Sequence, residues 1–599
     1  MTIRRRVRQA QTVVPFGVGA IFELQGESFV AIDVRDWRNA PSLTAPRLAA
    51  ALRVQGFRSA PPARESDFDL PDGPGVPYMR FPAWLFCGSC RRLARWNRDD
   101  ERPGKAPECR FCPRNTLTPM RFVQVCANGH LGDIDWWYWA HATSDPEKRG
   151  ACSRDATLRY VTDSGSNGLE ALHIECDACS ARRDLLGVLR KGALAEIGVR
   201  CDGRQPWQRR EEREDCDSPP TVVQRGASNV YYPDVVSALD IPQDAPGGDL
   251  GVSAELIASL RNHLLWPAVT ADPDSSKAAR YAAVIATDVD VDEDVIVGLA
   301  RSESTGGATS AAPDPAGLGP DEWRAFTTSG SAGHQSAVFV TRTVPLLSGE
   351  PARRDSAALV CLVRQVVVAD RLREVRALRG FRRLSPDGRL IGVDPTGHNR
   401  WLPAVETFGE GIFIAFDEAA LSRWEGDERI QRRTARLRAP VAPRYVLLHT
   451  LAHLLIRQLA FDCGYGAASL RERIYASAGG DRQSGLLIYT SAGDAEGTLG
   501  GLAQRGMAGR LAETMIRLLE AGAWCSADPL CAEHLPTGSV RNLAACHGCA
   551  LVSETSCEAQ NSLLDRLLVV GGDSVPGFFA EVIDESRHAA AASIEGADA

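Results

Sequence analysis

The stretch WCSADPLCAEHLPTGSVRNLAACHGCALVSETSCE, residues 524–558, places five cysteines within thirty-five residues. Cys546 and Cys549 form a CxxC pair, a knuckle that can turn two thiolates toward one metal ion. With Cys531 and Cys557 they make the most economical four-cysteine zinc site, and Cys525 is the alternative to Cys531 as a ligand. Four protein ligands leave no open coordination position, so the stretch predicts a structural zinc rather than a catalytic one.

The chain has seventeen cysteines in 599 residues. Whether they are expected to form disulfides or to bind metal depends on the cellular compartment. The first twenty residues lack the continuous apolar core of a signal peptide. We also find no run of about eighteen apolar residues that would span a membrane. We therefore expect a cytoplasmic protein without a membrane partner, where thiols stay reduced and cysteine clusters indicate metal rather than disulfides.

A second concentration of ten cysteines lies between Cys87 and Cys216. Its clearest element is a pair of matched knuckles, which are Cys87 with Cys90 and Cys109 with Cys112. Two CxxC knuckles separated by a polar loop are typical of a zinc ribbon. A redox role requires one CxxC in a βαβ setting, so the sequence favours a structural zinc here.

The other cysteines of this region allow two further zinc sites. One set is a knuckle with two distant thiols, namely Cys176, Cys179, Cys201 and Cys216. The other begins with Cys126 and His130, whose spacing suits a zinc knuckle, and could be completed by His141 and Cys152.

The segment after Cys126 also permits an enzymatic alternative. His130, Asp133 and Asp135 could form the site of a metal-dependent nuclease or hydrolase. The aromatic run 136–139 could stack on bases, although core packing is the simpler interpretation. His and Asp occur together in many short segments without chemistry, so this alternative ranks second.

Two other enzymatic patterns are incomplete. His449 and His453 share one face of a helix expected over residues 444–460, as in zinc metalloproteases. That motif requires a glutamate directly after the first histidine, and Thr450 stands there, so a polar stripe or a contact is expected instead. The sequence also lacks a P-loop, which excludes that type of ATP-hydrolysing motor.

Length and pattern predict an α+β multidomain chain. Its parts are a zinc-ribbon-like, cysteine-rich N-terminal region and an α/β C-terminal domain with a four-cysteine zinc site. The expected ranges are a β-rich segment at 1–80, the cysteine-rich region at 81–220, a mixed helical region at 221–335 with a flexible linker near 303–322, the C-terminal domain at 336–585, and a disordered tail at 586–599.

The net charge of −8 argues against a uniformly basic nucleic-acid surface. Local basic clusters remain candidates for DNA contacts: Arg209, Arg210 and Arg213, with Arg4–Arg6 and the arginines of 371–383. Solvated faces or ion pairs with nearby acids are the simpler interpretation of each cluster.

These residues carry a family resemblance. The segments HTLAHLLIRQLAFDCGYGAASLRERIY, GLLIYTSAGDAEGTLGGL and DPLC…AACHGCALVSETSCE resemble a cysteine-rich domain found at the C-terminus of some superfamily 2 DNA helicases. The chain as a whole, including QTVVPFGVGAIFEL, CANGHLGDIDWWYW and VYYPDVVSALDIP, resembles the DrmB family of the DISARM antiphage defence system.

The resemblance implies a bacterial, zinc-binding accessory subunit that binds a DrmA-like superfamily 2 helicase and engages DNA through the complex. It implies zinc ligation by Cys531, Cys546, Cys549 and Cys557, and it assigns no catalytic residue. Besides the hydrolase, a stand-alone DNA-binding protein is the remaining alternative.

Overall fold

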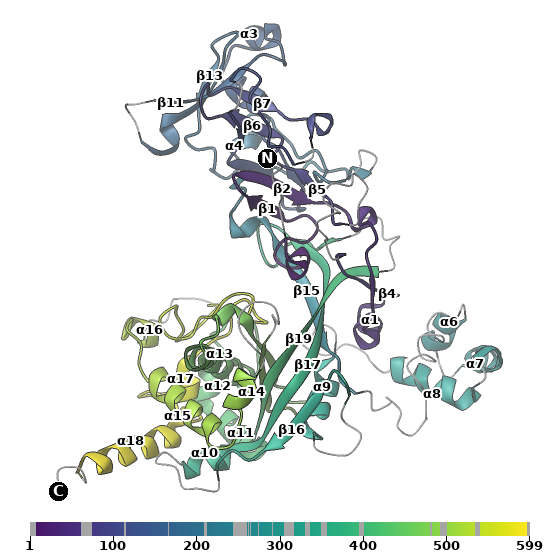
Figure 1. Cartoon of the computed structure of the whole chain (residues 1–599), viewed down its shortest axis with the longest axis vertical. Helices are drawn as coiled ribbons and strands as arrows, with labels where there is room; N and C mark the ends of the chain where they lie inside the picture. The colour runs from purple at the N-terminus through teal and green to yellow at the C-terminus, as the bar shows by residue number, and fades with distance from the viewer. Residues whose placement is uncertain are drawn as a thin grey trace. The chain divides into compact units, whose positions relative to one another are not determined.

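A computed structural model describes most of the chain. The described residues are 7–61, 75–102, 104–112, 115–163, 165, 167–208, 212–242, 260, 263, 265–272, 275–289, 291–304, 317–329, 336–348, 356–393, 401–479, 482–490, 500–533 and 540–595. They fold into two compact units (Figure 1). The first contains Met1–Ala45, Arg53–Ser237 and Arg376–Glu406, and the second contains Pro46–Leu52, Ala238–Val375 and Thr407–Ala599.

The first unit is built from small three-stranded antiparallel sheets. Their strand orders are β1-β2-β5, β7-β6-β8, β10-β9-β14 and β11-β12-β13. The strands are β1 Ile21–Leu24, β2 Glu27–Ala31, β5 Tyr78–Arg80, β6 Trp84–Cys87, β7 Leu93–Arg95, β8 Leu117–Pro119, β9 Phe122–Val125, β10 Leu131–Gly132, β11 Leu158–Thr162, β12 Leu172–Cys176, β13 Arg182–Asp184 and β14 Thr221–Gln224. Its helices are α2 Trp136–His141, α3 Pro146–Ala151 and α4 Ala193–Glu196.

Late residues of the chain complete the core of this unit. Leu378, Phe381 and Val405 pack with Val18, Val30 and other early residues in one buried cluster. Arg383 is fully buried beside it and donates hydrogen bonds to the carbonyls of Gly19, Gly129 and Val230. The expected range 336–585 therefore contains a segment that belongs with the N-terminal residues.

Three long strands, β15 Tyr232–Leu239, β17 Val363–Arg382 and β19 Trp401–Phe416, each contribute residues to both units. They belong to a sheet of order β15-β17-β19-β21-β20, completed by β20 Leu470–Tyr475 and β21 Gly485–Thr490. Short strands pair at its margins: β16 Val340–Val344 and β18 Ile391–Gly392 pair with β17, β4 Gly56–Arg58 pairs with β19, and β3 Ser42–Leu43 pairs with β4.

Helices cover both faces of this sheet in the second unit. Side chains alternate along a strand, so Ile412 and Ile414 of β19 pack against the helix α13, Pro443–Cys463. Phe413 points to the opposite face, where it stacks on Phe326 of α9, Gly319–Thr327. Burial on both faces explains why this part of β19 is apolar at every position from 412 to 416.

The remaining helices of the second unit surround α13 or form a separate small cluster (Figure 1). Those packed with α13 in the main core are α10 Ala357–Leu362, α11 Glu418–Glu425, α12 Glu428–Thr434, α14 Gly501–Arg505, α15 Arg510–Gly522, α17 Arg566–Val570 and α18 Ala580–Glu595. A short helix, α16 Leu530–Glu533, and α1 Pro46–Leu52 complete the set, and α6 Trp266–Ala271, α7 Ser276–Val289 and α8 Glu293–Ser304 share their own apolar core.

Helix α13 agrees with the helix expected over residues 444–460. Among the described residues it is the helix long and apolar enough to cross a membrane, but 67% of its most apolar window is buried inside the chain. Val446, Leu448 and Ile456 are among its side chains in the main core. Its apolar character is therefore explained by its place at the centre of the second unit.

Two sequence expectations change at this level. The tail expected to be disordered at 586–599 is helical up to Glu595 as part of α18, because Val582 and Ile583 anchor that helix in the core and alanines extend it. The expected linker at 303–322 lies mainly outside the described residues, and its two ends belong to α8 and α9.

Candidate metal centres

Four groups of cysteine and histidine side chains, and one mixed group, gather donor atoms within 4.8 Å of one another in the described residues. Every cysteine of the chain except Cys361 and Cys463 belongs to one of these groups. Thiolate sulfurs around one tetrahedral zinc lie roughly 3.8 Å apart, because each Zn–S bond is about 2.3 Å long. The separations found in these groups are of that size.

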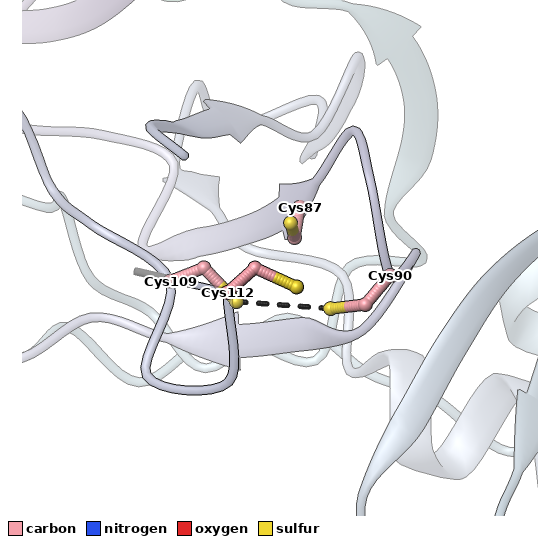
Figure 2. A group of neighbouring side chains, drawn as sticks. All are labelled: Cys87, Cys90, Cys109 and Cys112. Carbon is pink, nitrogen blue, oxygen red and sulfur yellow. Dashed lines mark hydrogen bonds between the residues drawn. The ribbon is translucent and has the colours of Figure 1, made fainter. Parts of the chain in front are cut away.

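The first group is the zinc ribbon expected from sequence. Cys87 ends β6, Cys90 lies on the turn that follows, and Cys109 and Cys112 come from the facing loop (Figure 2). The Cys90 and Cys109 sulfurs are 3.7 Å apart. Burial resists ionisation of Cys87, but N–H groups and neighbouring thiols overcome it and lower its pKa to about 7.

Backbone hydrogen bonds explain why a CxxC segment turns its sulfurs inward. Arg91 N–H donates to the Cys87 carbonyl, and Cys87 N–H donates to the Arg92 carbonyl, with Arg91 at φ +61°. The same pattern recurs at Cys176, where Ser180 has φ +57° and donates to the Cys176 carbonyl. Two knuckles of unrelated sequence thus share one local fold, which the CxxC spacing predicts.

The second group contains Cys126, His130, Cys201 and Cys216. Cys126 Sγ lies 3.4 Å from His130 Nδ1 and 4.0 Å from Cys216 Sγ. The other ring nitrogen of His130, Nε2, is 3.3 Å from a Glu214 carboxylate oxygen. A carboxylate that accepts the distal N–H holds the histidine in the tautomer that can bind metal through Nδ1.

Electrostatics in this group favours a thiolate at Cys126. The pKa of Cys126 falls to about 4 because Cys201 donates to its sulfur and His130 lies beside it, although burial opposes this. A small pocket lined by Cys126, His130 and Cys201 lies among these side chains. The donor types and the space therefore fit a zinc ion.

The third group contains His141, Cys152, Cys176 and Cys179. His141 Nδ1 is 2.7 Å from the Trp137 carbonyl, to which it donates, so Nε2 is free to accept and lies 3.1 Å from Cys179 Sγ. Cys152 and Cys176 sulfurs are 3.7 Å apart. The helix α2 thus supplies a histidine whose tautomer suits metal binding.

These two groups correct the sequence-based sets. Cys176 and Cys179 do not join Cys201 and Cys216; the latter pair completes the group of Cys126 instead. His141 and Cys152 complete the Cys176 knuckle rather than the group of Cys126 and His130. The physical reason is topological, because β9 and β14 pair and carry the segments after Val125 and before Thr221 to one place.

The fourth group lies within residues 524–558, and its membership also differs from the expected set. Cys525 and Cys531 join Cys546 and Cys549, with sulfur separations of 3.4 Å for Cys525–Cys546 and 3.7 Å for Cys531–Cys549. Both candidates for the fourth ligand are therefore present. Cys557 is absent from this set and lies with His449, His453 and Glu472.

Helix α13 contacts the fourth group through the side chain of Arg457. Arg457 donates to the carbonyls of His547, Gly548 and Leu551, which immediately surround the knuckle. On the other side, Cys525 N–H donates to Asp528, which is paired with Arg566. The knuckle is thus attached to two helices of the main core.

The residues of the hydrolase alternative are not arranged for catalysis. Asp133 is half-buried and accepts hydrogen bonds from the backbone N–H groups of Ala83 and Trp84, and desolvation raises its pKa to about 6. Asp135 caps the N-terminus of α2 through Tyr138 N–H. His130 lies in the second cysteine group, so the three side chains have separate structural partners.

Other sequence candidates also have structural roles. Trp136, Trp137 and Trp139 are buried, which leaves no ring face for bases. Arg379 and Arg382 pair with Asp234. Because Arg383 donates to three carbonyls, these arginines are not available as a DNA-binding cluster.

Of the three arginines singled out for DNA, the structure places one. Arg213 is exposed between Glu212 and Glu214. Arg209 and Arg210 lie outside the described residues, as do Arg4–Arg6. An exposed arginine with acidic neighbours is a weak site for a phosphate.

The chain is similar to known proteins in two segments and along most of its length. A model named Domain of unknown function (DUF8724) matches residues 8–232, and the MrfA Zn-binding domain matches residues 451–550. DISARM protein DrmB of Bacillus paralicheniformis is 29% identical over 594 residues, which is 91% of this chain and 96% of that protein. The chain resembles DrmB along nearly its whole length.

The resemblance to DrmB expected from the sequence is thereby confirmed, and so is the fold class of a multidomain α+β chain with cysteine-rich zinc modules. The match to a zinc-binding domain and the donor sets together identify zinc as the cofactor. The matched zinc-binding domain contains Cys525, Cys531, Cys546 and Cys549 but ends before Cys557.

Proposed function

We propose that this chain is a zinc-stabilised, non-motor subunit of an antiphage defence complex, in which it binds a DrmA-like superfamily 2 DNA helicase and helps that helicase engage DNA. The similarity to DISARM protein DrmB over 91% of the chain carries the proposal. The match to the MrfA Zn-binding domain supports the zinc-dependent part of it.

We also propose that the four cysteine-rich groups each hold one zinc. The ligands are Cys87, Cys90, Cys109 and Cys112; Cys126, His130, Cys201 and Cys216; His141, Cys152, Cys176 and Cys179; and Cys525, Cys531, Cys546 and Cys549. Each set supplies four protein ligands, so the ions hold loops in place and leave no position for a substrate. This arrangement favours a scaffold over an enzyme.

The structural roles of Asp133 and Asp135 weigh against the metal hydrolase, and the sequence has no P-loop for a motor. The net charge of −8 disfavours extensive DNA contact by this chain alone. The proposal therefore assigns DNA engagement to the complex with the helicase.

Co-purification with a DrmA-like superfamily 2 helicase tests the proposal. The two proteins should elute together, and the complex should bind DNA more tightly than the helicase alone, with an affinity that falls steeply between 50 and 200 mM salt. The isolated chain should show no ATPase and no nuclease activity.

Arg213→Ala provides a matched variant. It should change the DNA affinity of the complex less than about threefold, since one phosphate contact contributes little to binding and acidic neighbours weaken it further. A larger loss would favour direct DNA binding by this chain. Separate elution with unchanged DNA affinity, or nuclease activity of the isolated chain, would refute the accessory role.

A further inference from the structure

A fifth group of metal-binding side chains lies at the centre of the second unit, outside the cysteine modules. It consists of His449 and His453 on α13, Glu472 on β20, and Cys557 on the loop after the fourth group. His449, His453 and Glu472 are at most 1% exposed, and Cys557 is 8% exposed. The group is therefore sealed from solvent by the core that surrounds α13.

The distances within this group are those of ligands that share an ion. His449 Nε2 lies 3.2 Å from Cys557 Sγ and 3.0 Å from Glu472 Oε1. His453 Nε2 lies 3.4 Å from the same carboxylate oxygen. Ligands of a tetrahedral zinc with bonds of about 2.0 to 2.3 Å are roughly 3.3 to 3.8 Å apart, so only a small adjustment is needed.

The hydrogen bonds of His453 leave no proton between its Nε2 atom and the Glu472 carboxylate. His453 Nδ1 is 2.8 Å from the Ala550 carbonyl and must donate to it, so in the neutral ring Nε2 carries a lone pair. That lone pair faces the Glu472 carboxylate, another acceptor, and two buried acceptors repel each other. A cation between them removes the conflict.

Buried polar atoms without hydrogen-bond partners also indicate a cation in this group. His453 Nε2 and Glu472 Oε2, two atoms that belong to this group, are buried without a hydrogen-bond partner. Buried polar groups without partners are costly, and a cluster of them in one place calls for an unrecorded ligand. Burial raises the pKa of Cys557 well above its ordinary value, and the backbone N–H groups of Ala559 and Asn561, which donate to its sulfur, oppose that rise.

Charge balance suits complete burial. Two neutral imidazoles, one carboxylate and one thiolate carry a total charge of −2, which a divalent cation neutralises. A four-thiolate zinc keeps a net charge of −2, and the Cys87 and Cys525 groups accordingly contain partly exposed ligands. The ligand types, which are imidazole, thiolate and carboxylate, are those that zinc accepts together.

We propose that His449, His453, Glu472 and Cys557 form a separate, mixed-ligand zinc site that fastens helix α13 and strand β20 to the end of the cysteine module. Four protein ligands and full burial make it structural. The inference stands independently of the helicase partnership.

Zinc stoichiometry of the full-length protein tests the site. Wild-type protein should carry five zinc ions per chain by elemental analysis and native mass spectrometry. Glu472→Gln, which keeps the shape but removes the charged ligand, should carry four. Glu410→Gln is the matched control, because Glu410 is also buried and accepts backbone hydrogen bonds but lies in no metal-binding group; it should keep five.

His453→Gln provides a second variant, since its amide can still donate to the Ala550 carbonyl while the metal ligand is lost. It should also carry four zinc ions. If one variant fails to fold, the other still decides through its zinc content relative to wild-type protein. A folded Glu472→Gln or His453→Gln protein with the zinc content of wild-type protein would show that the group is a hydrogen-bonded network without metal.

Discussion

At the scale of single residues, Cys525 and Cys557 differ from their expected roles. Cys525 belongs to the group with Cys546 and Cys549, and Cys557 does not. A knuckle is defined within about five residues, so Cys546 and Cys549 could be paired from the sequence. The ligands that complete a site come from any segment that the fold brings near, and spacing along the chain does not identify them. The same limit explains why Cys201 and Cys216 were paired with the wrong knuckle.

The two assignments of Cys557 can be separated with double variants. Cys525→Ser combined with Cys549→Ser should remove one zinc, because both ligands belong to one site. Cys525→Ser combined with Cys557→Ser should remove two, because the ligands belong to different sites. Elemental analysis of the two proteins makes the comparison, and equal losses would contradict the separation of Cys557 from the fourth group.

Glu214 offers a test at a residue that contacts a ligand rather than the ion. Glu214→Gln should weaken zinc binding at the group of Cys126 by about 10-fold to 100-fold, because the carboxylate orients His130. Competition with a chromogenic chelator measures this. Asp215→Asn, a change at an exposed neighbour, is the control and should leave the zinc affinity unchanged.

At the scale of elements, α13 was predicted well and its partners were not. The apolar spacing over residues 444–460 identified the helix, and the pair His449 and His453 was recognised as lying on one face. Glu472 of β20 was not connected with them, since a lone glutamate on a strand carries no local signal. The fifth cysteine of the opening stretch, left over from a four-ligand site, was the available hint.

The contact between α13 and the knuckle leads to a further prediction. Arg457→Ala should weaken zinc binding by the Cys525 group and lower the melting temperature, because three carbonyls around the knuckle lose their donor. Arg432→Ala, on the exposed face of α12, should change neither. Normal zinc retention by Arg457→Ala under chelator competition would count against this supporting role.

Arg383, the residue after strand β17, is one of the arginines that the sequence offers for DNA contact. Arg383→Ala should instead destabilise the first unit by about 3 kcal/mol or more, because the guanidinium donates to three buried carbonyls. Thermal unfolding measures the loss, and Arg371→Ala, at an exposed position of the same strand, is the control. A stable Arg383→Ala protein with weakened DNA binding in the helicase complex would restore the DNA interpretation.

At the scale of the whole molecule, zinc should contribute to the stability of both units, since each contains candidate zinc sites. Binding of structural zinc by small domains is worth about 10–16 kcal/mol at neutral pH. Prolonged treatment with a strong zinc chelator should therefore make both units sensitive to protease, whereas a magnesium-selective wash should not. Protection of either unit after complete zinc loss would contradict its dependence on metal.

The fold class could be predicted from composition and motifs, but the division of the chain could not. Sequence boundaries were placed where composition changes, and the structure mixes distant segments because β15, β17 and β19 each contribute to both units. The local sequence of such a long strand does not differ from that of a strand that lies within one unit. Only the packing of Leu378 and Phe381 with early residues reveals which unit they complete.

That interleaving has a consequence for synthesis on the ribosome. All ligands of the first three groups lie before residue 217, whereas Arg376–Glu406 is needed to finish the core of the same unit. The cysteine modules can thus take up zinc before any residue of Arg376–Glu406 has been translated. We expect a fragment that ends after β15 to bind metal yet remain loosely packed around its missing strands.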